Sequence, residues 1–162
     1  MISRMLDSGL RKIGLIGGSK NYVVNRTRMR GYQEAFARAR QELDETLVFE
    51  DCDSPARIQD AVDCLIRARA ECIVCMDDVV CLSVLQILAK KDIAVPHQIQ
   101  VASFYDSALL KNNKPAITSL GFDDKALGAL TCKTLLDYIG GKEVQGKTRV
   151  DYELVTRAST LF

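Results

Sequence analysis

The chain has 162 residues and a formal net charge of +1, with 22 Lys and Arg against 21 Asp and Glu. This length suits one compact domain. The near-neutral charge excludes a self-sufficient DNA-binding module, which would carry a basic excess to neutralise phosphates, so any nucleic-acid contact belongs to a part outside these residues. No secretory signal and no long apolar run is present, so we expect neither export nor membrane insertion.

Short apolar strands alternate with amphipathic helices along the first half of the chain. Gly9 is expected to close a helix that covers residues 3–8, since glycine tolerates the left-handed cap conformation. Strands are predicted at residues 12–17 and 46–49. A helix between them is predicted from a stripe of apolar residues at helical spacing: Met29, Tyr32, Phe36, Ala39 and Leu43. Ser54-Pro55 is the signature of a helix start, an N-cap followed by proline at the first helical position.

The second half continues the alternation. Further elements are predicted as follows: strands at 72–76 and 99–104, an extended piece at 117–120, helices at 79–90 and 124–139, and a last strand at 150–156. The helix at 79–90 is apolar almost all round, which is typical of a helix that is deeply buried or covered by a second subunit. Repeated strand–helix–strand units with short links predict an α/β fold, a doubly wound and mostly parallel sheet with helices on both faces.

The six cysteines favour a reducing compartment such as the cytoplasm, with buried thiols acting as small apolar residues. Cys72-x-x-Cys75 has the spacing of a metal or redox motif. Successive side chains of a strand point to opposite faces, however, so we expect these two thiols to be separated. We therefore predict no metal and no cofactor.

Candidate site residues follow two of the predicted strands. Gly17, Gly18 and Ser19 lack the spacing of a phosphate-binding loop, and a tight turn at a ligand cleft fits them better. Asp77-Asp78 ends the third strand, where parallel sheets bind their ligands. We expect Asp78 to cap the next helix, and this is compatible with contact between Asp77 and a ligand. A receiver domain, which also uses acidic residues after strands, is excluded because its acidic pair after the first strand is replaced by glycines.

Catalysis is not indicated. No Ser/His/Asp or Cys/His arrangement is visible, and the single histidine, His97, lies in a loop. Arg28, near the start of its helix, is by itself no different from an ordinary solvated arginine.

These segments, taken in order, resemble the regulators of the lactose/galactose repressor family. The similar segments are residues 9–18 (family pattern GHRRIA-IGG), 28–36 (R-x-x-GF-x-AL), 77–83 (ND-x-x-ALG), 95–106 (VP-x-DISV-x-GFDD), 117–120 (LTTV), 127–128 (LG) and 154–160 (LV-x-R-x-ST). Each motif alone is degenerate, whereas seven in sequence are specific.

The resemblance implies a two-lobed, periplasmic-binding-protein-like module behind a helix-turn-helix head. Residues 1–119 would form the C-terminal lobe, residues 120–146 would cross into the N-terminal lobe, and residues 147–162 would return for a last strand. The head and most of the other lobe lie outside this sequence. Operator DNA would be a partner through that head, and the family also implies a homodimer, for which the helix at 79–90 offers the interface.

Site residues also come from the resemblance. Arg28 matches the family arginine that holds the effector, Asp77 takes the place of an asparagine, and Phe122 stands where a crossover residue approaches the ligand. Tyr105 replaces the first aspartate of the family's GFDD, which accepts hydrogen bonds from sugar hydroxyls, so an ordinary hexose is not assured. Ser19 completes the predicted effector-binding set.

The sequence thus predicts a cytoplasmic, non-enzymatic sensor of a small sugar-like metabolite that modulates operator binding. The alternatives are a sugar-binding protein of a transport system and a small α/β enzyme. The helix at 124–139 carries an apolar stripe, and we expect that stripe to pack on another chain or back onto its own lobe. One lobe offers half of a closing site, so we expect these residues alone to bind no simple sugar better than about millimolar.

Overall fold

The computed structural model describes residues 1–162. Helices and strands alternate as predicted. Their order is α1 (Ile2–Asp7), β1 (Ile13–Ile16), α2 (Val23–Arg38), a 3-10 turn η1 (Glu45–Leu47), β2 (Val48–Phe49), α3 (Pro55–Arg67), β3 (Cys72–Cys75), α4 (Asp78–Lys90), β4 (Gln100–Ser103), α5 (Ala108–Lys111), β5 (Thr118–Gly121), α6 (Asp124–Ile139) and β6 (Glu153–Val155).

The six strands form one sheet in the order β2-β1-β3-β4-β5-β6. The ladders from β2 through β5 are parallel, with Leu15 of β1 paired to Val48 on one side and to Val74 of β3 on the other. The chain runs outward from β1 to β2 and then returns to place β3 on the opposite side of β1. The sheet is therefore doubly wound, as predicted, and its topological switch point lies between β1 and β3.

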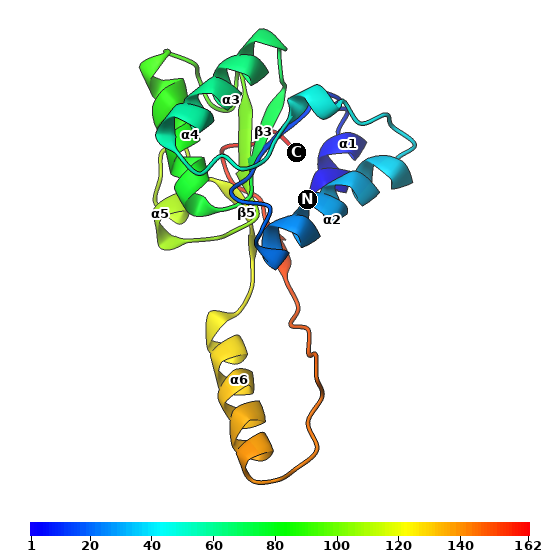
Figure 1. Ribbon diagram of the computed structural model, residues 1–162. Helices are drawn as coiled ribbons and strands as arrows, with labels where there is room; N and C mark the ends of the chain where they lie inside the picture. The colour runs from blue at the N-terminus through cyan, green and yellow to red at the C-terminus, as the bar shows by residue number, and fades with distance from the viewer. The chain divides into compact units, whose positions relative to one another are not determined.

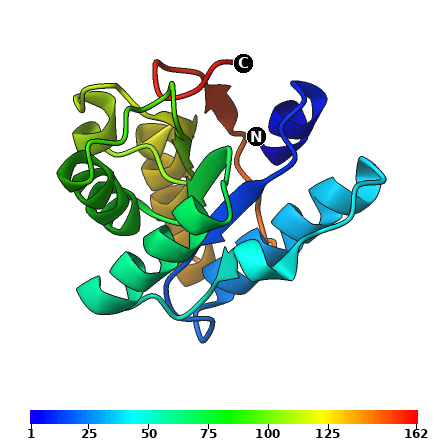
Figure 2. The ribbon, with the colours of Figure 1, turned by 90° about the horizontal axis from the view of Figure 1, so that it is seen from above.

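Helices cover both faces of this sheet. Figure 1 shows α3 and α4 on one side of β3 and α1 and α2 on the other, and Figure 2 shows the same layers from above. Alternate strand residues serve the two cores: Cys75 packs with the α3–α4 cluster, and Cys72 packs with the α1–α2 cluster. The predicted separation of the two thiols is confirmed, because residues three apart on a strand face opposite ways.

Gly9 ends α1 in the way the sequence predicts. Its φ of +100° lies in the region that glycine adopts without strain. The Leu10 amide donates to the Met5 carbonyl at 3.1 Å, and the Gly9 amide donates to the Leu6 carbonyl at 3.1 Å. This pair of bonds is a Schellman motif, which satisfies the last carbonyls of the helix.

Several predicted bounds were wrong. The helix α2 ends at Arg38, so Leu43 lies beyond it, although Leu43 still packs against the same core. The predicted strand at 46–49 is a 3-10 turn followed by the two residues of β2, and the last strand is three residues long instead of seven. The short helix α5 was missed because it lies in a polar loop and is capped by Ser107.

The chain divides into two units. Unit 1 comprises residues 1–120 and 154–162, and unit 2 comprises residues 121–153. The assignment of residues 120–146 to the N-terminal lobe of a longer protein stays a prediction. None of the helices is long and apolar enough to cross a membrane.

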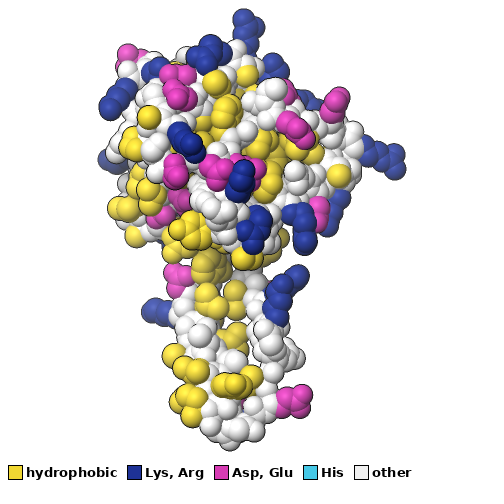
Figure 3. All heavy atoms as spheres, viewed as in Figure 1, with side chains coloured by type: hydrophobic (Ala, Val, Ile, Leu, Met, Phe, Trp, Pro, Cys, Tyr) yellow, Lys and Arg dark blue, Asp and Glu magenta, His cyan; other side chains and the backbone are white.

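Unit 2 consists of α6 and the segment that follows it. Asp123 caps α6 through its carboxylate, and Gly140 follows the last helical residue, as predicted. No residue of α6 is buried, and Ile139 is 72% exposed. Figure 3 shows hydrophobic side chains gathered on this unit. Within unit 2 the apolar stripe is therefore at most half-buried, and its packing on another chain or on its own lobe stays a prediction.

Candidate functional site

The candidate site lies at the carboxyl edge of the parallel sheet, on either side of the switch point. The loop after β1 carries Gly17, Gly18 and Ser19, and the residue that follows Met76 at the end of β3 is Asp77. A crevice forms at this place in doubly wound sheets because the two neighbouring strands send their chains to opposite faces. The fold therefore brings Ser19 and Asp77 to the same edge.

The β1–α2 loop is held by hydrogen bonds to the β2–α3 loop. The Gly17 amide donates to Phe49, and its carbonyl accepts from the Cys52 amide, both at 2.9 Å. The buried side chain of Asn25 donates from Nδ2 to the Ser19 carbonyl at 2.9 Å. Sequence reasoning missed Asn25; the signal was an asparagine within the first turn of a helix that starts at a glycine-rich loop.

Asp77 caps helix α4. Its backbone is extended, and its Oδ1 accepts from the Val80 amide at 2.8 Å. The prediction that Asp78 caps the helix was wrong by one position, since Asp78 is already the first helical residue. An N-cap carboxylate uses one oxygen for the helix and leaves the other available for a ligand.

Arg28 reaches the same edge from α2. Its side chain is half-buried, and Nη1 donates to the Met76 carbonyl. Burial disfavours the guanidinium charge and lowers the pKa of Arg28, while attraction to Asp77 acts in the opposite direction. The interpretation of Arg28 as an ordinary solvated arginine is therefore wrong, and its charge lies beside that of Asp77.

A cavity of about 410 Å³ opens at this edge and includes two of the five predicted site residues, Ser19 and Asp77. The rest of the lining comes from the β1–α2 loop, the start of α3 and the first turns of α4: Gly18, Tyr22, Cys52, Asp53, Ser54, Pro55, Ile58, Val79, Val80 and Ser83. Arg28 and Tyr105 are not among the lining residues. We call this space the edge cavity. The residues from Cys52 to Ile58 were not predicted as site residues, because their loop has no motif.

Tyr105 and Asp106 follow β4. The Tyr105 amide donates to Ser103 Oγ at 3.1 Å, and the tyrosine side chain is half-buried. The carboxylate of Asp106 forms a bidentate ion pair within the fold, because Arg157 donates to it from Nη1 at 2.6 Å and from Nη2 at 3.2 Å. Burial disfavours the charge of Asp106, but hydrogen bonds from Arg157, Ser119 and Lys111 outweigh it and hold the pKa of this carboxyl below its usual value.

Phe122 belongs to unit 2, where it is half-buried directly after β5. The effector-binding roles of Arg28, Ser19, Asp77, Tyr105 and Phe122 stay predictions.

The grouping and burial of the side chains bear on metal binding and on the reactivity of the thiols. No three His, Cys, Asp or Glu side chains are grouped closely enough to hold a metal ion. All six cysteines are free thiols. Burial raises the pKa of Cys52, Cys72 and Cys75, so the thiols nearest to the sheet are weak nucleophiles at neutral pH.

Comparison with known proteins defines the class. Residues 2–160 match the family described as "Periplasmic binding protein-like domain". The chain belongs to this family. Among its relatives is the HTH-type transcriptional regulator CelR of Thermobifida fusca, which is 28% identical over 144 residues, 88% of this chain and 42% of CelR.

Solved structures agree. The structure of the transcription regulator CcpA of Lactococcus lactis matches with a TM-score of 0.88 at 32% identity, over 99% of this chain and 59% of that one. A transcriptional regulator CelR–cellobiose complex has a TM-score of 0.87 at 25% identity, over 98% of this chain and 50% of that one. The chain thus spans about half the length of the relatives it matches, and these relatives are regulators of the kind that the sequence resembles.

Proposed function

We propose that these residues form the effector-sensing part of a transcription regulator, in which a small sugar-like metabolite bound at the carboxyl edge of the sheet modulates operator binding. The observation that carries the proposal is the convergence of Asp77 and Ser19 on one cavity, with Arg28 beside Asp77, at the switch point of the sheet. One relative, CelR, is named as a complex with cellobiose. The transport-protein alternative has no such support, because the relatives quoted are regulators.

In the proposed mechanism, the side chains of Asp77 and Arg28 are oriented by the protein and then contact the ligand. Asp77 and Arg28 each bond to the backbone of unit 1, which fixes their direction before a ligand arrives. A ligand that binds one arrangement of two lobes better than another shifts the population toward it. DNA contact would come through a helix-turn-helix head outside these residues, and the regulator would act in the cytoplasm without catalysis.

Ligand binding is the direct test. We propose to titrate the ¹⁵N-labelled chain with neutral sugars, amino sugars, sugar acids and purines, and to follow the amide signals of Ser19 and Asp77. Arg28→Ala should weaken the response at least about tenfold if the guanidinium makes a charge-assisted bond to the ligand. Arg30→Ala is the matched control, since Arg30 is on the same helix with 75% of its side chain exposed. Equal responses in both variants, or no ligand in any class, would reject the proposed function.

DNA binding is tested separately. The DNA upstream of the Met1 codon should encode a helix-turn-helix in the same reading frame, and the longer product should bind an operator in a metabolite-dependent manner. An upstream frame that encodes a secretory signal would favour the transport protein instead.

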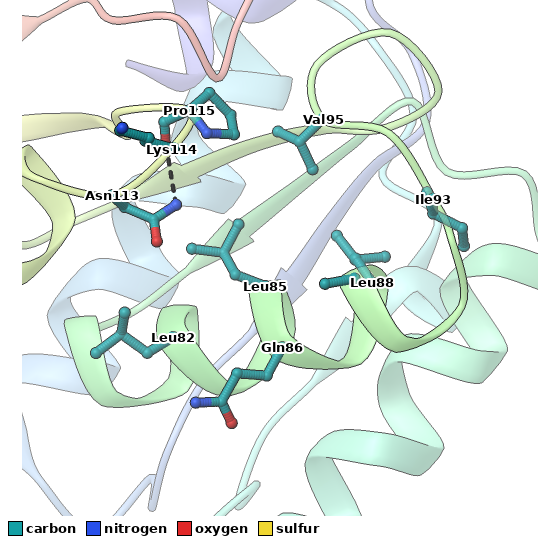
Figure 4. Close-up of a pocket in the computed structure, with 10 residues that line it drawn as sticks. Leu82, Leu85, Gln86, Leu88, Ile93, Val95, Asn113, Lys114 and Pro115 are labelled. Atoms are coloured by element: carbon teal, nitrogen blue, oxygen red, sulfur yellow. Dashed lines mark hydrogen bonds between the residues drawn. The ribbon is translucent and has the colours of Figure 1, made fainter.

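We also propose a homodimer through an apolar groove beside α4. The groove encloses about 340 Å³ and is lined by residues of α4 and of the two loops that lie over it, among them Leu82, Leu85 and Pro115. Figure 4 shows Leu85 rising from α4 toward the loop that carries Asn113 and Pro115. Asn113 Nδ2 donates to the Pro115 carbonyl at 3.0 Å and fixes that loop.

Sedimentation tests the dimer. The chain should sediment as a dimer at high micromolar concentration, and Leu85→Glu should make it monomeric because a charge would enter an apolar interface. Leu109→Glu is the matched control, since Leu109 is 62% exposed and does not line the groove. A monomeric wild-type chain would overturn the proposed dimer and leave effector binding untouched.

A further inference from the structure

The lining of the edge cavity carries negative charge and no positive charge. Asp53 and Asp77 both line it, and none of its lining residues is Lys, Arg or His. The neighbouring Lys20 is paired outside the lining with Asp51, at 3.3 Å between Nζ and Oδ2. An anionic group that entered the cavity would therefore meet two carboxylates in the lining, while the guanidinium of Arg28 lies beside Asp77 but outside the lining.

One oxygen of Asp77 is left for a ligand. Oδ1 is used by the Val80 amide at 2.8 Å. Oδ2 lies 4.0 Å from the position that a Cβ would occupy on Gly18, so it lies near the glycine loop that forms another part of the lining. The charge of Arg28 lies beside the Asp77 carboxylate, but Arg28 Nη1 donates to the Met76 carbonyl and forms no ion pair with Asp77. A carboxylate oxygen without an ion-pair partner attracts a cationic or hydroxyl donor.

The hydroxyl groups of the cavity also offer acceptors. Ser83 already donates its hydroxyl proton to the Val79 carbonyl at 3.0 Å, which leaves only its lone pairs for a ligand. Asp53 is held loosely, with Arg57 Nη1 at 3.9 Å and 63% of its own side chain exposed. Ser19 and Ser54 accept from the Asn21 and Arg57 amides and keep their hydroxyl protons, so a ligand that satisfies this lining brings both donors and acceptors, as a hydroxylated ring does.

An aromatic ring stands at the same cavity. Tyr22 lines it and is 66% exposed, so its ring face is open to a ligand. Aromatic faces attract ammonium groups through the ring quadrupole, and they also pack against the C–H face of a sugar ring. The exposed side chain of Val79 adds apolar surface.

From these observations we propose that the edge cavity selects a hydroxylated ligand that carries a protonated amine, an amino-sugar-like molecule, and disfavours sugar acids and sugar phosphates. The ammonium group binds Asp77 Oδ2 and the ring packs on Tyr22. This inference rests on the proposed function and specifies the class of effector.

Three probes that share one ring test the charge preference: glucosamine, glucose and glucuronate, each titrated to tens of millimolar into the ¹⁵N-labelled chain below neutral pH. We expect glucosamine to bind about fivefold more tightly than glucose, the size of effect that one partly solvated charge pair gives, and glucuronate to bind most weakly.

Asp77→Asn separates charge from structure. Asparagine caps a helix as well as aspartate does, so α4 keeps its cap while the charge is removed. The variant should bind glucosamine and glucose equally. Asp78→Asn is the matched control: it removes the same charge one position later, at a residue that does not line the cavity, and should keep the preference.

Each outcome decides the inference. Loss of the preference in Asp77→Asn alone supports it. Equal binding of the three probes by the wild-type chain, or an unchanged preference in Asp77→Asn, overturns it while leaving an effector site in place. Absence of binding by all three probes overturns it as well, and the proposed function then stands or falls on the wider set of ligands and on the operator experiment.

Discussion

Replacement of Asp106 by asparagine tests how the C-terminal segment is held on the sheet. Arg157 donates both nitrogens of its fork to the two oxygens of Asp106, and the two side chains are only 16% and 9% exposed. Asparagine keeps the shape of the carboxylate but removes its charge, which leaves a nearly buried guanidinium uncompensated. Breaking one partner of a buried pair costs about 3–5 kcal/mol, and we expect about 3 because the amide oxygen still accepts one bond.

That loss is a large part of a typical stability of about 5–15 kcal/mol. With a slope of about 2 kcal/mol per molar urea, the midpoint of unfolding should fall by about 1.5 M. Lys111→Ala is the matched control, because Lys111 contacts the same carboxylate at 3.2 Å but is 50% exposed. Its exposed ion pair should contribute less than about 1 kcal/mol.

The pH dependence gives a second check. The pKa of Asp106 is lowered in the folded state, from about 3.8 in the unfolded chain, so its ionised form contributes stability above that value. The contribution is lost as the pH falls through the folded pKa, and the difference between the wild type and Asp106→Asn should then vanish. A midpoint within 0.3 M of the wild type at neutral pH, taking about 2 kcal/mol per molar, would refute the reasoning.

Three further predictions concern other parts of the chain. A Cβ on Gly17 would lie 2.5 Å from Met76 Sδ, so Gly17→Ala should destabilise the fold by about 1–3 kcal/mol in urea unfolding; no change would mean that Met76 moves freely. Cys132 is the one exposed cysteine, Cys64 is half-buried and the other four are buried, so the fastest phase with a thiol reagent should be lost in Cys132→Ser; an unchanged fastest phase in that variant would contradict this assignment. The chain alone should bind no simple sugar better than about millimolar in calorimetry, and a micromolar titration would mean that Arg28 belongs to a site complete within these residues.

Much of the fold could be predicted because its signals are local. The strands β1, β3 and β4 are apolar runs bounded by turn residues, and α3 begins at Ser54-Pro55, whose hydroxyl accepts from the Arg57 amide. The elements that were misjudged are short. Two residues of β2 and four of α5 are too few for a period to be visible, and their conformations depend on neighbours in the sheet and loops.

The site was less predictable, because its contacts join distant residues. Nothing near Arg28 in the sequence shows that its guanidinium meets a carbonyl 48 residues later. Whether Asp77 or Asp78 caps α4 depends on which of them is the last extended residue before the helix. Helix starts are uncertain by one or two residues, and the composition of the segment does not show which residue it is. The loop from Cys52 to Ser54 joins the edge cavity only through the order of the strands.

The double use of Asp77 limits how this site can change by mutation. Helix capping accepts aspartate, asparagine, serine and threonine at nearly equal cost, and other side chains lose about 1 kcal/mol. An exchange among these four residues changes the charge and the length of the side chain at the cavity, while the N-terminus of α4 stays capped. If Asp77 binds the effector as proposed, a single nucleotide change that exchanges aspartate for asparagine would change ligand preference without a stability penalty, whereas most other changes at this position would alter recognition and folding together.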